Sequence, residues 1–225
     1  MAGTTVDENN VVYKTIRKAI NDAGIEASLD EVLQHGAGKE KLQAIRDILL
    51  NVCGINDEDK TVAIHRAFRS LLEKAYEDLD VKPVEGAEDV FRHLRSHGVF
   101  CVLNTGYDAK TANVLLKKLN WDKADMVDGV ITASDVPRSR PFPDMIEAAM
   151  RLTGVLDPIE VIKIGDSTID IEEGQKAGCG LNVGITGGAQ TREQLELQGP
   201  DYVIDKLSEL IHIVERENRA SSYVY

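Results

Sequence analysis

The chain has 225 residues, of which 43% are hydrophobic and 28% are charged, the composition of a soluble globular protein of one large domain or a core with a smaller domain. Its net charge of -12 argues against nucleic acid or an anionic membrane as the main partner. We find no signal peptide and no apolar stretch near the length that spans a bilayer. The three cysteines lack the spacing of a zinc site or a disulfide framework, so we expect a cytoplasmic protein.

Residues 9–80 contain no strand pattern, and their apolar residues recur with helical spacing. A first stripe runs from Val11 to Ile25, a second covers residues 42–52 and a third covers residues 62–76. Between the first two stripes, the glycines of residues 34–41 predict a turn that leads into a helix. This part of the sequence therefore predicts a small helical unit.

After residue 83 the pattern changes to short apolar runs that alternate with helical segments. Strands that alternate with helices predict an α/β fold whose parallel sheet is covered on both faces. The last ten or so residues are polar, and we expect them to fray. The predicted strands are 99–103, 129–132, 161–164, 181–185 and 202–204, and the predicted helices are 85–97, 109–119, 143–153, one that ends at 177, 191–197 and 206–214.

Two acids follow the apolar run that ends at Ile164. Asp166 comes directly after Gly165, and Asp170 lies four residues further on. Buried carboxylates are costly unless a cation or hydrogen-bond donors satisfy them, and the carboxyl ends of strands are where open α/β sheets bind ligands. The alternative is structural: Asp166 or Ser167 caps a helix and Asp170 lies in its first turn.

A second polar loop, Asn104-Thr105-Gly106, follows the predicted strand 99–103. The Thr105 hydroxyl and the Gly106 backbone N–H suit a phosphate oxygen at the end of a strand. A simple Thr-Gly turn or helix cap is the alternative interpretation.

Four segments together resemble the loops of the haloacid dehalogenase-like (HAD) hydrolases, and more closely those of the phosphonatase-like branch. The resemblance implies a Rossmann-like core, residues 1–8 and 83–225, with an inserted C1-type helical cap, residues 9–82. It also implies Mg²⁺ as cofactor, a small anionic phosphonate or phosphate substrate, and an aspartate that attacks phosphorus. The four segments are residues 1–8 (MAGTTVDE), 103–108 (LNTGYD), 134–146 (SDVPRSRPFPDMI) and 165–170 (GDSTID).

The resemblance assigns roles to residues of these loops. Asp166 and Asp170, with the backbone carbonyl of Ala2, would bind Mg²⁺, which prefers oxygen ligands. Alanine at position 2 matches the phosphonatase-like branch, whereas phosphatases of this kind carry a general acid/base aspartate there. Arg140 would hold the transferring group, as part of the Arg-Pro-Phe-Pro pattern, although Arg138 is two residues away and competes for the role.

Lys39 matches a cap lysine that condenses with an aldehyde substrate in this branch, with Gly36 three residues before it. The resulting iminium would act as an electron sink for cleavage of a C–P bond. A solvated lysine in the first turn of a cap helix, or a basic residue that sets substrate specificity, is the alternative. By the same resemblance Thr105 is catalytic, and Thr105 and Gly106 bind phosphate. Lys163, unusual within a predicted buried strand, either marks the start of that strand or reaches the same pocket.

The nucleophilic aspartate of the family comes directly before the residue that matches Met1. We therefore expect a truncated or mis-started family member, with neighbouring strands unpaired, weakened Mg²⁺ binding and little phosphoryl transfer. A phosphoglycolate-like small-molecule phosphatase is a second hypothesis, against which Ala2 argues, and a silent family member is a third. The resemblance also implies a homodimer through the cap, although the stripe that contains Tyr76 suits the interior of the cap equally well.

Overall fold

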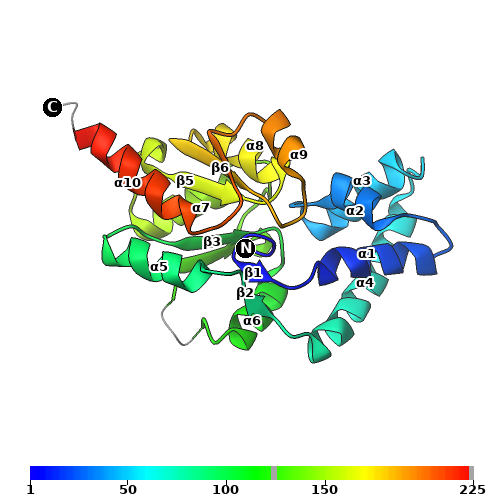
Figure 1. Ribbon diagram of the computed structural model, residues 1–225. Helices are drawn as coiled ribbons and strands as arrows, with labels where there is room; N and C mark the ends of the chain where they lie inside the picture. Colours follow the sequence, from blue (N-terminus) through cyan, green and yellow to red (C-terminus); the bar gives the residue numbers. More distant parts are fainter. Residues whose placement is uncertain (123–125, 223–225) are drawn as a thin grey trace.

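The computed structural model describes residues 1–122 and 126–222 of the chain (Figure 1). The strands are β1 (Val6–Asp7), β2 (Lys82–Pro83), β3 (Val102–Thr105), β4 (Gly129–Thr132), β5 (Ile162–Gly165), β6 (Leu181–Ile185) and β7 (Tyr202–Ile204). The helices are α1 (Val11–Asp22), α2 (Leu29–Gly36), α3 (Lys41–Asn51), α4 (Glu58–Asp78), α5 (Ala87–Ser96), α6 (Ala109–Lys118), α7 (Asp144–Thr153), α8 (Thr168–Ala177), α9 (Arg192–Leu197) and α10 (Glu209–Ser222), with short 3-10 turns at Ala133–Asp135 and Pro158–Glu160.

The second half of the chain forms the expected α/β fold with parallel strands. Strand β3 pairs with β4, and β5, β6 and β7 pair in that order, with every pair parallel. Helices α7 and α8 pack directly on the strands, and α5 packs on α10. The loops after β3 and β5 lie on the same side of the molecule, because Asn104 near the end of β3 donates to Glu173 of α8, the helix that follows β5.

Strands β3 and β5 are edge strands of two separate sheets and are not paired with each other. Between them lies a cavity of about 440 Å³, lined by both strands and by side chains of α5, α7 and α10. Met1 and Asn104 line its end nearest the polar loops. The expectation of unpaired neighbouring strands thus agrees with the observed arrangement.

Helices α1–α4 pack on one another and lie to one side of the α/β part (Figure 1); we call them the helical unit. Their interior holds the predicted apolar stripes, with Ile16, Ile45 and Phe68 almost fully buried. Helix α2 is a correction to the sequence analysis, which predicted no helix between the first apolar stripe and the glycine turn. A capping box starts it, in which the Ser28 side chain accepts from the Glu31 N–H and the Glu31 carboxylate accepts from the Ser28 N–H.

The two chain segments that connect the helical unit to the α/β part run side by side. Strands β1 and β2 are antiparallel, with Val6 opposite Pro83 and Asp7 opposite Lys82. Asn9 and Asn10 adopt left-handed backbone conformations that turn the chain into α1. The helical unit is therefore inserted at one narrow junction.

Strands β4, β6 and β7 have the bounds that the sequence predicts, whereas β3 and β5 are displaced toward the carboxyl end. Helix α10 continues to Ser222, beyond the predicted end at residue 214, and residues 223–225 lie outside the described part of the chain. Within residues 1–122 and 126–222, none of the helices combines the length and apolar character needed to cross a bilayer.

Candidate active site

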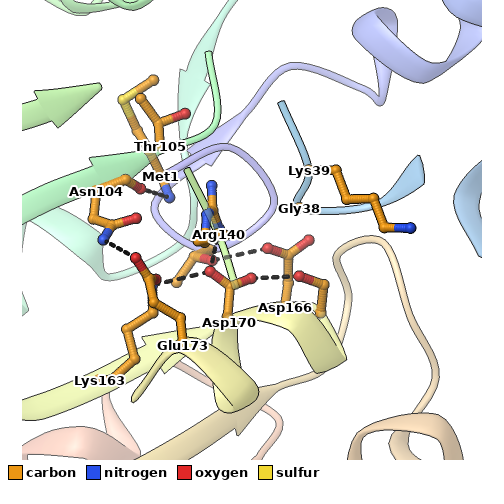
Figure 2. Close-up of polar contacts among 12 residues, drawn as sticks. Met1, Gly38, Lys39, Asn104, Thr105, Arg140, Lys163, Asp166, Asp170 and Glu173 are labelled. Carbon is orange, nitrogen blue, oxygen red and sulfur yellow. Dashed lines mark hydrogen bonds and ion pairs between the residues drawn. The ribbon is translucent and has the colours of Figure 1, made fainter. Parts of the chain in front are cut away.

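Three loops converge at the carboxyl ends of β3 and β5 (Figure 2). Thr105 ends β3, and Asp166 follows β5 directly. The first residues of the chain lie between them, since the Met1 amino group donates to the Asn104 carbonyl oxygen at 3.2 Å. Segments that are far apart in the sequence therefore meet at the strand ends, as the sequence analysis expected.

A cluster of four buried charged side chains forms the base of this site (Figure 2). Arg140 Nη1 pairs with Asp170 Oδ1, and both side chains are almost fully buried. Lys163 Nζ lies 2.9 Å from the same Asp170 oxygen and 3.0 Å from Glu173 Oε2. Glu173 Oε1 accepts from Asn104 Nδ2 at 3.0 Å, so the cluster connects β5 and α8 to the end of β3.

The two cations of the cluster determine its protonation. Burial alone would raise the pKa of the Asp170 carboxyl, but Arg140 and Lys163 outweigh burial and hold that pKa well below its usual value. Burial likewise favours the neutral form of Lys163, yet Asp170 and Glu173 raise the pKa of its amine. Asp170 and Lys163 are therefore both charged at neutral pH.

Asp166 lies in a tight glycine-lined niche. Its carboxylate accepts from Thr4 Oγ1 at 3.1 Å and from the Ala189 N–H at 2.8 Å. A Cβ on Gly3 or on Gly188 would lie within 2.4 Å of an Asp166 side-chain oxygen, so only glycine allows these backbones to approach. Burial first, and then the charge of Asp170, raise the pKa of Asp166.

Of the two arginines in the proline-rich loop, Arg140 reaches the site. Its side chain is 6% exposed and faces Asp170. The Arg138 side chain is 57% exposed, pairs with Asp144 and stacks on the ring of Phe142. The sequence analysis favoured Arg140, with Arg138 as its competitor, and of these two it is Arg140 that faces Asp170.

Thr105 and Gly106 form the contact between the strand end and the helical unit. Thr105 is buried, and its Oγ1 accepts from the Tyr107 N–H at 3.2 Å. A Cβ on Gly106 would lie 2.9 Å from the carbonyl oxygens of Gly38 and Lys39, which belong to the loop between α2 and α3. This loop therefore covers the strand end at backbone contact distance.

The two lysines beside this loop have opposite environments. The Lys39 side chain is 25% exposed, pairs with Asp47 at 2.5 Å and points away from Arg140 and Asp170 in Figure 2. Lys41 is buried, and its Nζ donates to the Lys39 carbonyl oxygen at 2.6 Å. The structure thus brings Thr105, Arg140, Asp166 and Asp170 together (Figure 2) but leaves the Lys39 amine at the edge.

Glu8 forms a second buried polar cluster next to Lys41. The Tyr76 hydroxyl donates to Glu8 Oε2 at 2.9 Å, and the Tyr107 hydroxyl donates to Glu8 Oε1 at 2.8 Å. Burial raises the pKa of Glu8 to about 7, although both hydrogen bonds favour the ionised form. Tyr76 is thus part of the interior, the second of the two interpretations that the sequence allowed.

Comparison with known proteins identifies the family. The model of the haloacid dehalogenase-like hydrolases matches residues 1–183. The chain belongs to the haloacid dehalogenase-like hydrolase family. It is 29% identical to a phosphonoacetaldehyde hydrolase of Bacillus cereus, over 99% of this chain and 88% of the relative, and 28% identical to a pyrophosphatase, PpaX, of the same species, over 73% and 74%. A solved structure, a phosphonoacetaldehyde hydrolase-like protein of Oleispira antarctica, covers all of this chain and 92% of its own with a TM-score of 0.82 at 24% identity.

This HAD chain offers a limited set of metal ligands. Asp166 and Asp170 are oxygen donors, and the repulsion that raises the pKa of Asp166 is what a divalent cation would relieve. Arg140 and Lys163 already bind Asp170, however, and the described residues contain no group of three or more His, Cys, Asp or Glu side chains arranged to hold a metal. A Mg²⁺ ion held by so few carboxylates would have to keep several of its waters.

Sequence reasoning did not identify three residues of the HAD site: Lys41, Glu8 and Glu173. Glu173 carried a visible signal, because it lies three residues after Asp170 and so on the same helix face. Glu8 and Lys41 carried none, since their burial depends on tyrosines from distant parts of the chain.

Proposed function

We propose that the site binds a small phosphonate or phosphate compound together with Mg²⁺ and transfers its phosphoryl group. The observation that carries this proposal is the buried cluster of Arg140, Asp166 and Asp170 beside Thr105, where the loops after β3 and β5 converge. The phosphonoacetaldehyde hydrolase relative supports the phosphonate as substrate class, because the similarity extends over nearly the whole chain.

Each residue has a role in the proposed reaction. The Arg140 guanidinium neutralises the oxygens of the bound group, and its buried position makes that charge more effective than it would be in water. The Thr105 hydroxyl and the Gly106 N–H donate to the same oxygens. Asp166, Asp170 and the Ala2 carbonyl would hold Mg²⁺, which would supply additional positive charge to the site.

The proposed transfer also needs a carboxylate that accepts the phosphoryl group. The Met1 nitrogen is buried, and burial lowers the pKa of this amino group to about 5 despite the nearby charges of Asp170 and Asp166. The resemblance has this nucleophile directly before the position that matches Met1, and the charges of Arg140 and Lys163 act on the Met1 amino group.

The helical unit acts as a cap in this proposal. Residues 9–82 would cover the site, and residues 1–8 and 83–225 would form the core that carries the phosphate and metal ligands. A homodimer through the cap and a cytoplasmic location complete the proposal; light scattering would report the dimer. A phosphoglycolate-like phosphatase is less well supported, because Ala2 provides no acid for an alkoxide leaving group.

Binding of phosphonoacetate in the presence of Mg²⁺, followed by calorimetry, tests the proposal. Arg140→Lys should weaken binding about 10- to 100-fold, the value of one or two charge-assisted hydrogen bonds. Arg138→Lys is the matched control and should bind like the unmodified chain. Equal affinities of all three proteins, each shown to be folded by circular dichroism, would refute the assignment of the phosphoryl site to Arg140.

A further inference from the structure

Tyr13, a buried residue of helix α1, connects the helical unit to the loop that covers the candidate active site. Its hydroxyl oxygen accepts from the Gly38 N–H at 3.0 Å. Gly38 belongs to the loop between α2 and α3, whose carbonyl oxygens lie against Gly106 at the end of β3. The hydroxyl of Tyr13 is therefore held where the helical unit meets the strand ends.

The same glycine brings this hydroxyl next to the acidic loop after β5. A Cβ on Gly38 would lie 2.5 Å from Ser167 Oγ, so the backbone of the covering loop packs directly on Ser167 (Figure 2). Ser167 follows Asp166 in the chain, and its hydroxyl donates to Asp170 Oδ2 at 2.5 Å. Tyr13 Oη is thus one hydrogen bond away from the backbone that covers the predicted metal ligands.

The charges of the site act on Tyr13. Burial first, and then the negative charge of Asp166, raise the pKa of the Tyr13 hydroxyl well above its usual value, and Arg140 acts in the opposite direction. Charges influence a hydroxyl in this way only when they lie near it. The hydroxyl consequently keeps its proton at neutral pH and remains a hydrogen-bond donor.

That proton has no partner in the part of the chain that the structure describes. Tyr76 and Tyr107, the buried tyrosines nearby, donate their hydroxyl protons to the two oxygens of Glu8. The Tyr13 hydroxyl, in contrast, accepts from Gly38 but donates to none of the residues 1–122 and 126–222. A buried donor without an acceptor costs free energy, and an oxygen of a bound ligand would remove that cost.

We propose that the Tyr13 hydroxyl donates a hydrogen bond to an oxygen of the phosphonate or phosphoryl group of the substrate. The helical unit then contributes a binding residue for this group, opposite in origin to Arg140 of the α/β part. The inference rests on the proposed function, because it places Tyr13 and Arg140 on the same ligand. The oxygens of Asp166 already accept from Thr4 and from the Ala189 N–H, so a ligand oxygen is the better acceptor.

Calorimetric titration with methylphosphonate and with phosphonoacetate, in the presence of Mg²⁺, tests the inference. Tyr13→Phe keeps the ring, whose centre lies 5.3 Å from the Lys41 amine, and removes only the hydroxyl. It should weaken the binding of both anions about 10- to 100-fold, the value of a hydrogen bond to a charged group. Tyr202→Phe is the matched control, because this hydroxyl of β7 donates to Glu217, and it should bind like the unmodified chain.

Tyr13→3-fluorotyrosine separates the two hydrogen bonds of the hydroxyl. Fluorine makes the phenol more acidic, so the hydroxyl becomes a better donor and a poorer acceptor. Donation to the ligand then predicts tighter binding of methylphosphonate, whereas a hydroxyl that serves only to accept from the Gly38 N–H predicts weaker binding. This variant keeps the hydroxyl in place, so the question is decided even where Tyr13→Phe does not fold.

Three results would overturn the inference. The first is an unchanged affinity of Tyr13→Phe for both anions, in a protein that circular dichroism shows to be folded. The second is weaker binding of phosphonoacetate alone, since the contact would then be with its carboxylate and not with the phosphonate. The third is an unchanged or lower affinity of the 3-fluorotyrosine variant for methylphosphonate.

These measurements distinguish the inference from the proposed function. If Arg140→Lys weakens binding and Tyr13→Phe does not, the inference is wrong and the proposed function stands. If the unmodified chain binds neither anion, the proposed function is refuted and the inference falls with it. Weakened binding by both variants, with Tyr202→Phe unaffected, supports both.

Discussion

Replacing Glu8 by Gln is expected to change how the free energy of unfolding depends on pH. Glu8 is 3% exposed, and the polar groups that act on it are the hydroxyls of Tyr107 and Tyr76, the charge of Lys41 and the backbone N–H of Val12. Burial raises its pKa from 4.5 to about 7. A glutamine of the same size keeps the packing and an amide oxygen for the tyrosines, but it does not titrate.

The sign follows from the protons bound in each state. Between pH 4.5 and 7, Glu8 of the unfolded chain is ionised, while Glu8 of the native protein keeps its proton. The native state then binds more protons, so the free energy of unfolding falls as the pH rises through this range. At about 1.4 kcal/mol per pH unit, the interval from 4.5 to about 7 corresponds to about 3 kcal/mol.

Urea unfolding followed by circular dichroism, at several values between about pH 4 and pH 8, measures this effect. The stability of the Glu8→Gln variant relative to the unmodified protein should rise by about 3 kcal/mol across the range. Other groups that titrate there, including the Met1 amino group, contribute to both curves and cancel in the difference. Two curves that stay parallel within about 0.5 kcal/mol would refute the reasoning.

Further predictions concern the charge cluster, the covering loop and the nucleophile. Lys163→Met should lower the free energy of unfolding, measured with urea, by about 3–5 kcal/mol, because it leaves buried carboxylates without a cation. Adding Glu173→Gln should recover part of this loss, and no recovery would contradict the pairing of Lys163 with Glu173. Gly38→Ala should destabilise the protein by about 1–3 kcal/mol more than Gly24→Ala, since both have positive φ but only the first Cβ meets neighbouring atoms; equal costs would argue against the close approach. An apolar strand that ends in Asp, fused before Met1, should raise the Mg²⁺-dependent hydrolysis of phosphonoacetaldehyde, measured as phosphate release, whereas the same strand ending in Asn should not.

The sequence predicts the α/β part well because its signals are local. Short apolar runs between glycines and polar loops predict β4, β6 and β7 with their observed bounds. Helix α2 was harder to predict, since it has eight residues, few of them apolar, and ends at a glycine that was interpreted as part of a turn. The available signal was its capping box, Ser28 with Glu31, because a search for apolar periodicity does not detect polar capping residues.

For the candidate site, the sequence indicates which loops meet but not which side chain faces inward. Arg138 and Arg140 are two residues apart, and so are Lys39 and Lys41. The segment around the two arginines shows neither helical nor strand spacing of its apolar residues. The side chains of Arg140 and Lys41 are buried, whereas that of Arg138 is exposed and that of Lys39 is partly exposed. That difference arises from contacts with distant residues, which spacing along the chain does not encode.

The pairing of β1 with β2 brings the two ends of the helical unit onto neighbouring positions of one small ladder, where opposite residues lie about 5 Å apart. A segment with adjacent ends can be exchanged for another of different length without displacing the strands that flank it. Lys41 would travel with such an exchange, while Arg140 and Asp166 would stay behind. The helical unit and the buried charge cluster are thus encoded by separate parts of the chain, and grafting this insert onto a related scaffold would transfer the first without the second.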